Sequence, residues 1–195
     1  MNVQLTSTPA IDKRNSILEA SVRLIRQYGF HGTSMSLIAQ EAQVATGTIY
    51  HYFESKDDLI LAVFAHCQVQ LYVSIFDQDD RSMPYPQRLE TTWIKLASFY
   101  TERPDVLSFL EQFYSSPYLN LLRNNETLCG RDRVGAFLKE GIRRGYIKDV
   151  DENVVGAAFI GTAAAVAKQT NNGTFVFQEK HLAHMLAILW EGIKI

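Results

Sequence analysis

The sequence predicts an all-α protein, in which an N-terminal three-helix head with a helix-turn-helix is joined by a long helix to a C-terminal helical bundle. The first observation behind this is that apolar residues recur at three- and four-residue spacing along most of the chain. The second is that no segment shows a persuasive two-residue alternation. Residues 174–177 are the one short strand candidate, and they are too isolated to pair.

The composition is that of an ordinary soluble globular protein, with 47% hydrophobic and 21% charged residues. A formal net charge of −2 disfavours a non-specific nucleic-acid coat protein. Cys67 and Cys129 have no metal-ligand spacing and make no disulfide framework, which fits a reduced cytoplasm. The N-terminus lacks a signal peptide, and the weakly polar run at 154–167 is too short to span a bilayer. We therefore expect a cytoplasmic protein without a membrane segment, metal or cofactor.

The first helix should run from about residue 11 to residue 28 and end at Gly29, after a polar, disordered arm over residues 1–10. Its buried side would carry Ile17, Leu18, Val22, Ile25 and Tyr28.

Two short helices separated by a tight turn follow, over residues 34–42 and 46–53. In the second, Ile49 and Phe53 lie four residues apart and share an apolar face. The opposite face and its flanks carry small polar and aromatic residues: Gly47, Thr48, Tyr50, His51 and Tyr52. Such a surface suits the major groove of DNA, where short polar side chains meet base edges and phosphates.

Ser55 caps a long helix that begins at Lys56 and extends into the seventies. Apolar residues lie nearly all round this helix, which predicts burial on most faces. They are Leu59, Leu61, Ala62, Phe64, Ala65, Val69, Leu71, Tyr72 and Phe76. The acidic loop at 77–80 lacks the distal ligand and glycine of a cation site, so we expect it to be solvated.

The second part of the chain carries further helices, separated by proline, glycine and asparagine-glycine breaks. Their expected ranges are about 87–101, 105–114, 118–122, 134–144, 151–170 and 178–192. We predict that residues 1–56 form a helix-turn-helix DNA-binding domain and residues 57–195 a ligand-binding and dimerisation domain.

The run GFHGTSMSLIAQEAQVATGTIYHYFESKDDLI, residues 29–60, resembles the DNA-binding signature of the tetracycline-repressor (TetR/AcrR) family of bacterial regulators. The similarity covers roughly residues 11–65 and departs from the family pattern twice. Gln43 stands where the family usually has glycine, and a left-handed conformation there would cost about 1–2 kcal/mol. Ala45 stands where a serine commonly caps the recognition helix, so the capping hydroxyl is absent or comes from Thr46.

The resemblance implies a homodimeric regulator of double-stranded DNA, usually a repressor, that leaves an inverted-repeat operator when a small effector binds. The residues that match the family's DNA-contacting positions are Ser36, Thr46, Gly47, Thr48, Tyr50, His51 and Tyr52. Lys56 matches its phosphate clamp. The alternative for Lys56 is an ordinary first-turn lysine, partly neutralised by Asp57 and Asp58.

The aromatic residues of the second part are many for a bundle of this size, and most of them fit a core. The resemblance implies that some line a cavity for an apolar or aromatic effector. The candidates are Phe64, Cys67, Leu71, Trp93, Phe109, Phe113, Phe137, Phe159 and Thr162. Polar groups that would orient such a ligand are Thr92, Gln112, Asn120 and Thr162.

The last two helices combine small residues on one with long aliphatic residues on the other. They either complete the core of the monomer or pair across a two-fold axis as a four-helix interface, where the resemblance places the family's dimer contact. The candidate interface residues are Ala164, Ala167, Leu182, Met185, Leu186 and Leu189.

Two other functions compete with a ligand-responsive regulator. In one, the head binds DNA and the bundle docks a protein partner. In the other, the chain is a small helical enzyme, because Cys67 beside His66 suggests a thiol nucleophile with a base. Adjacent helical residues point about 100° apart and do not face one another, and no third orienting group is evident. We therefore expect no catalysis.

Overall fold

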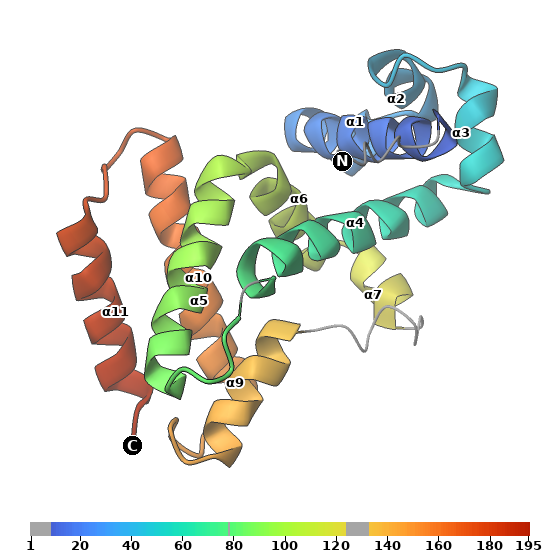
Figure 1. Ribbon diagram of the computed structural model, residues 1–195. Helices are drawn as coiled ribbons and strands as arrows, with labels where there is room; N and C mark the ends of the chain where they lie inside the picture. Colours follow the sequence, from blue (N-terminus) through green and yellow to red (C-terminus); the bar gives the residue numbers. More distant parts are fainter. Residues whose placement is uncertain (1–8, 78, 124–132) are drawn as a thin grey trace, which may run out of the picture. The chain divides into compact units, whose positions relative to one another are not determined.

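The all-α prediction is confirmed by the computed structural model, which describes residues 9–77, 79–123 and 133–195 (Figure 1). Within these ranges every regular element is a helix, and residues 174–177 form no strand. Ile147 and Lys194 make an isolated antiparallel bridge there.

The helices follow the predicted order. They are α1 (Pro9–Gly32), α2 (Met35–Glu41), α3 (Thr46–Tyr52), α4 (Lys56–Phe76), α5 (Tyr85–Glu102), α6 (Pro104–Tyr114), α7 (Tyr118–Arg123), α9 (Arg133–Arg143), α10 (Glu152–Asn171) and α11 (Glu179–Ile193). Helix α1 begins two residues earlier than predicted, and the rest of the predicted arm, residues 1–8, lies outside the described residues.

The chain divides into two compact units. The first consists of Met1–Gln68 and Ser108–Asn125, and the second of Val69–Leu107 and Glu126–Ile195. Helices α4 and α6 each contribute residues to both units. The first unit is therefore larger than the predicted head of 56 residues, because it also includes the start of α4, the second half of α6 and α7.

The core of the first unit contains the predicted apolar side of α1, with one exception. Ile17, Leu18 and Ile25 are buried, but Tyr28 is 51% exposed, so its predicted burial is wrong. The cause is Gly29, which leaves the helical conformation at φ 68° and ψ 177° and redirects the chain. As a result, Phe30 takes the buried position, with its ring against Phe109 and Tyr118.

The second unit is organised around α10, which packs mainly against α5 and α9. The indole nitrogen of buried Trp93 on α5 donates to the Thr162 hydroxyl on α10 at 3.0 Å. The small residues predicted for this helix allow such close approach, because Ala163 and Ala167 are fully buried.

In the acidic loop before α5, Asp77 and Asp80 are exposed as predicted, whereas Asp79 is half-buried. Asp79 accepts two hydrogen bonds from the buried Arg88 guanidinium, at 2.9 and 2.6 Å, and Arg88 also lies 3.6 Å from Glu140. The hydrogen bond from Arg88 holds the pKa of Asp79 below its usual value. No local sequence pattern indicates this pair, because its partners meet only after the chain turns.

Helix α4 is less completely buried than its composition predicts. Val69 and Val73 are each 54% exposed, so the prediction that Val69 is buried is wrong. A helix with apolar residues on all sides offers no polar face that would indicate which side meets solvent. Among the described helices, α4 alone is long and apolar enough to cross a membrane by length and composition, but half of its most apolar window is buried inside the protein.

Candidate nucleic-acid interface

The first helix of the candidate interface, α2, is held at its start by a side-chain cap. Ser34 precedes the helix in an extended conformation, and its hydroxyl accepts a hydrogen bond from the Leu37 amide at 3.2 Å. The hydroxyl of Ser36 lies 2.9 Å from that of Ser34 and is exposed. Ser36 therefore stands at the exposed N-terminus of a helix, where backbone amides and the helix dipole favour an anion such as a phosphate.

The turn between α2 and α3 keeps a left-handed geometry without glycine. Gln43 has φ 56°, the one non-glycine residue with positive φ among the described residues. The Val44 amide donates to the Ala39 carbonyl at 2.9 Å, and the Gln43 amide donates to the Gln40 carbonyl at 3.1 Å. These two bonds form a Schellman motif, which satisfies carbonyls at the end of α2. These hydrogen bonds offset part of the cost of a left-handed Gln43.

The start of α3 lacks a capping side chain, which is one of the two alternatives left open by alanine at position 45. Ala45 occupies the N-cap in an extended conformation, and no side chain accepts from the first-turn amides. The Thr48 amide donates instead to the Ala45 carbonyl at 2.8 Å. Open amides at this end of the helix remain available to an anionic partner.

Helix α3 turns its apolar side inward and its polar side outward. Ile49 and Phe53 are buried in the first unit. Thr46, Gly47, Tyr50 and His51 are exposed, and Thr48 and Tyr52 are half-buried. A Cβ added at Gly47 would meet nothing within 4 Å, so the outer surface of α3 is open there. The structure therefore brings the predicted contact residues of α3 to one accessible surface.

Lys56, the predicted phosphate clamp, has a partner inside the protein. Its ammonium donates to the Phe30 carbonyl at 2.6 Å, and the residue is half-buried. An ammonium has three donors, so two can still be directed elsewhere. The neighbouring Ser55 caps α4 as predicted, because its hydroxyl accepts from the Asp58 amide at 3.1 Å and donates to the Asp58 carboxylate at 2.8 Å.

Two contacts that sequence reasoning missed brace α2 and α3 against α1. The Arg23 guanidinium donates twice to Glu41 at the end of α2, at 3.1 and 3.2 Å. Arg14 lies over the Phe53 ring, 5.3 Å from its centroid. Neither pair has a local sequence signal, because the partners are 18 and 39 residues apart. Both pairs leave the outer side of α3 uncovered.

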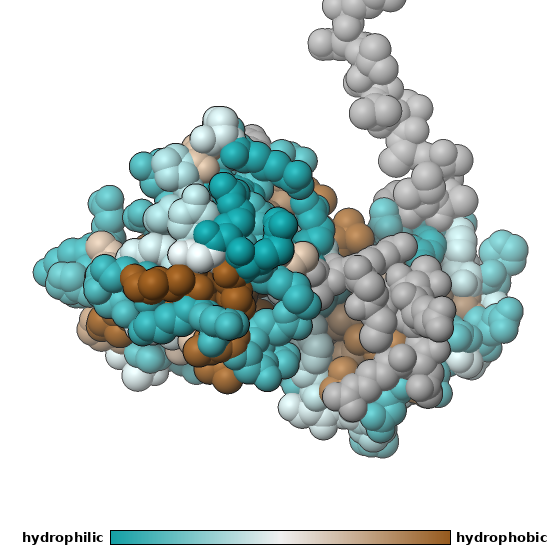
Figure 2. Space-filling view, turned by 90° about the horizontal axis from the view of Figure 1, so that it is seen from below, coloured by the Kyte–Doolittle hydropathy of each residue, from teal (hydrophilic) through white to brown (hydrophobic). Residues whose placement is uncertain are grey.

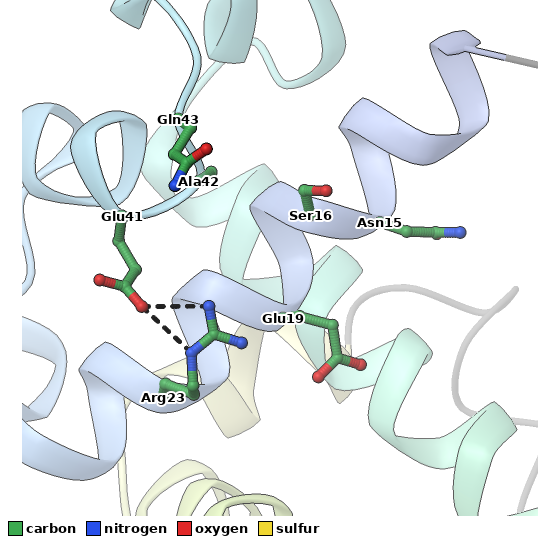
Figure 3. Close-up of a pocket in the computed structure, with 7 residues that line it drawn as sticks. All are labelled: Asn15, Ser16, Glu19, Arg23, Glu41, Ala42 and Gln43. Atoms are coloured by element: carbon green, nitrogen blue, oxygen red, sulfur yellow. Dashed lines mark hydrogen bonds and ion pairs between the residues drawn. The ribbon is translucent and has the colours of Figure 1, made fainter.

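A polar hollow of about 400 Å³ lies between α1 and the turn after α2 (Figure 3). It is lined by Asn15, Ser16, Glu19, Arg23, Glu41, Ala42 and Gln43. Figure 3 shows the ion pair of Arg23 and Glu41 at its edge. The hollow contains none of the residues predicted to hold an apolar effector.

The residues predicted to contact an effector fall into two groups, one in each unit. In the first unit, Phe64 stacks on Phe113 at 4.4 Å between centroids, Phe109 lies beside them, and Cys67 is fully buried. In the second unit, Leu71, Trp93, Phe137 and Phe159 are buried and Thr162 is half-buried. Each group forms part of the core of its own unit, and an effector cavity stays a prediction.

The polar groups predicted to orient an effector have partners or lie in other environments. Gln112 donates to the Ile25 carbonyl at 3.2 Å, and Thr162 accepts from Trp93. Thr92 is buried, and Asn120 is exposed on α7.

The residues predicted to form a dimer contact differ in accessibility within the single chain. Ala167, Leu186 and Leu189 are buried and face the core of their own unit, whereas Ala164, Leu182 and Met185 are half-buried. The same two helices expose other apolar residues, namely Val154, Ile160 and Ile188. The face drawn in Figure 2 is mostly hydrophilic, with hydrophobic residues gathered in a few groups.

The pair that suggested an enzyme is not arranged for catalysis. The His66 Nε2 lies 2.7 Å from the Glu19 carboxylate, and neighbouring Cys67 is fully buried. Among the described residues, no group of three or more His, Cys, Asp or Glu is placed to hold a metal ion.

Comparison with known proteins identifies relatives of both parts of the chain. The family model described as bacterial regulatory proteins, tetR family, matches residues 17–63, which include every predicted DNA contact. A second model, described as tetracyclin repressor-like, C-terminal domain, matches residues 84–194.

Individual relatives agree with these matches. The HTH-type transcriptional regulator HbdR of Aromatoleum is 41% identical over 162 residues, which cover 80% of this chain and 69% of HbdR. An HTH-type transcriptional regulator of Haemophilus influenzae is 28% identical over 184 residues, 94% of this chain and 96% of the relative. The crystal structure of a TetR family transcription regulator from Marinobacter aquaeolei has a TM-score of 0.82 at 25% identity, covering 94% of this chain and 96% of that one.

Proposed function

The chain belongs to the tetR family of bacterial regulatory proteins, and from this premise we propose that it is a homodimeric repressor that leaves a palindromic operator when a small apolar molecule binds. It is a DNA-binding transcriptional regulator and not an enzyme. As a regulator of bacterial genes it would act in the cytoplasm.

Sequence-specific binding to an operator is supported by the arrangement of α3. Its buried side fixes the helix through Ile49 and Phe53, while Thr46, Gly47 and Tyr50 stand exposed. The dimensions of a helix with short polar side chains fit the major groove, and base-edge hydrogen bonds from such side chains discriminate sequence. The exposed hydroxyls of Thr46 and Tyr50 are the side chains that we assign to base or phosphate contact.

The test is a selection of duplexes from a randomised library by the wild-type protein, followed by affinity measurements on the selected duplex. We expect the duplex to contain an inverted repeat. Thr46→Ala and Tyr50→Ala should each weaken binding by about 1–3 kcal/mol and change which bases are tolerated. Thr91→Ala, at an exposed threonine of α5 in the second unit, is the matched control and should bind like wild type. Equal binding by all three variants would contradict this use of α3.

A homodimer is supported by the apolar residues that α10 and α11 expose. Ile188 is 72% exposed, although an isoleucine gains about 1.5–3 kcal/mol when it is fully buried. We expect Ile188→Asp to produce folded monomers in sedimentation, because an aspartate in an apolar contact leaves an unpaired buried charge. Ile195→Asp, at a similarly exposed residue at the end of the chain, should remain dimeric. A dimer in Ile188→Asp would place the contact elsewhere.

An apolar effector is supported by the aromatic interior and by a relative. The fatty acid metabolism regulator protein of Bacillus subtilis is 28% identical over 162 residues, 77% of this chain and 79% of the relative. Its name says that it regulates fatty acid metabolism, and a fatty acid has an apolar chain. Side chains such as Trp93 and Phe159 would suit a cavity for such a chain. Lauric acid is a suitable first probe, and its release of the selected duplex would support the proposal.

A further inference from the structure

The end of α1 is a point where several elements of the first unit meet. Gly29 interrupts the helix with φ 68° and ψ 177°, so the regular pattern of backbone hydrogen bonds stops there. Side chains bond three carbonyls around this break. The Ile25 carbonyl accepts from Gln112 at 3.2 Å, the Gly29 carbonyl accepts from Thr33 at 2.8 Å, and the Phe30 carbonyl accepts from Lys56 at 2.6 Å.

These three donors come from different parts of the chain. Thr33 is local, Lys56 is the first residue of α4, and Gln112 lies on α6, 87 residues from its partner. The Gln112 amide nitrogen also lies 3.3 Å from the Ser108 hydroxyl one turn earlier on α6, which restricts its side chain. Its amide oxygen lies over Gly29, 3.6 Å from the position that a Cβ would take there.

Aromatic packing also holds this peptide in place. The Phe30 ring lies 5.9 Å from that of Phe109 on α6 and 4.9 Å from that of Tyr118 on α7. Burial, together with the Asp57 carboxylate in the first turn of α4, raises the pKa of the Tyr118 hydroxyl. Residues 29 and 30 are therefore fixed by α4, α6 and α7 together.

The position of this peptide matters for DNA binding because α2 starts five residues after Phe30. A shift at residues 29–30 is passed through the short connection at Thr33 to α2, and through the packing of α2 on α3 to the exposed side of α3. It also moves the carbonyl that holds the ammonium of Lys56.

We infer that Gln112 is a positioning residue for DNA binding, which fixes the end of α1 against α6 and so sets the orientation of α2 and α3 without touching DNA. This inference rests on the proposed function in one respect, because the effect of Gln112 is measured as affinity for DNA. The amide nitrogen is the group that acts, since it donates to the Ile25 carbonyl and neither a carboxylate nor a thioether carries a donor.

The experiment uses the full chain and the duplex selected by the wild-type protein. Gln112→Met keeps the length of the side chain and removes the donor, and Gln112→Glu keeps its shape. Each should weaken binding roughly 3- to 10-fold, the value of one neutral hydrogen bond. The slope of log affinity against log salt should stay that of wild type, because no phosphate contact is lost. Lys56→Met should flatten that slope by about one if Lys56 also contacts a phosphate.

Gln68→Met is the matched control, because it removes another glutamine amide bond of the same unit. The Gln68 amide donates to the Tyr114 hydroxyl at 3.1 Å and has no bond to α1. It should lower the melting temperature about as much as Gln112→Met and leave duplex affinity unchanged. Hydrogen exchange at residues 29–33 should accelerate in Gln112→Met and stay at the wild-type rate in Gln68→Met.

The outcomes separate cleanly. Wild-type affinity in Gln112→Met, or an equal loss in Gln68→Met, would overturn the positioning role. If Gln112→Met does not fold, Gln112→Asn retracts the amide by one methylene and must show the same loss of affinity. A wild-type protein that selects no duplex would overturn the proposed function, and unchanged exchange at residues 29–33 in Gln112→Met would then overturn the positioning role independently.

Discussion

Among the described residues of the first unit, Gly29 and Gln43 have positive φ, and they differ in how the chain tolerates them. Gly29 ends the regular part of α1 at φ 68° and ψ 177°, and Gln43 follows α2 at φ 56°. The first conformation belongs to a region that is essentially restricted to glycine. The second is the left-handed helical region, which other residues enter at a cost. Gly29 is therefore required by its backbone, whereas Gln43 is only tolerated in its position.

The largest effect should come from Gly29→Ala. A Cβ at residue 29 would have ordinary space, since its nearest neighbour is the Gln112 amide oxygen at 3.6 Å. The loss in the free energy of unfolding, about 1–3 kcal/mol, should therefore come from backbone strain. Urea unfolding measures it. Gly156→Ala, at a helical glycine of α10 with open space around it, is the control and should not destabilise. Equal stability of Gly29→Ala and wild type would show that the break can relax.

A smaller effect of opposite sign should follow from Gln43→Gly. Removing the side chain relieves about 1–2 kcal/mol of left-handed strain, and the greater flexibility of unfolded glycine takes back about 0.5–1 kcal/mol. The net expectation is a stabilisation of up to about 1.5 kcal/mol, measured by urea unfolding. Gln40→Gly, inside α2, is the matched control and should destabilise. A less stable Gln43→Gly would mean that the Gln43 side chain makes a stabilising contact.

Local signals account for most of what the sequence predicted correctly. Helix order, the cap at Ser55, the missing cap at Ala45 and the strained turn at Gln43 all depend on residues close in the chain. For the same reason, the inward side of α3 was predictable from the spacing of Ile49 and Phe53.

The errors arose where a residue's environment depends on distant segments. Tyr28 fits the apolar spacing of α1, but the break at Gly29 sends Phe30 inward in its place. Asp79 looked solvated because its partner Arg88 meets it only after the chain turns. Gln112 was considered for an effector, and its bond to Ile25 spans 87 residues. Periodicity shows which residues are apolar and does not show which elements cover them.

The smallest effect on stability, and the sharpest test of the exposed side of α3, should come from Gly47→Ala. Gly47 is helical and exposed, and a Cβ there would meet nothing within 4 Å inside the protein. Alanine is the better helix former, so the free energy of unfolding should rise by a few tenths of a kcal/mol, up to about 1 kcal/mol. The same methyl group would project from the surface that we assign to the operator.

Affinity for the selected duplex should therefore fall while stability rises, because added volume between a helix and a groove separates groups that hydrogen-bond at about 2.7–3.2 Å. Gly161→Ala, at an exposed helical glycine of α10 with equally open space, should gain similar stability and keep its duplex affinity. If Gly47→Ala bound the duplex as tightly as wild type, residue 47 would lie outside the contact, and the surface of α3 that meets DNA would have to centre on Tyr50 and His51 instead.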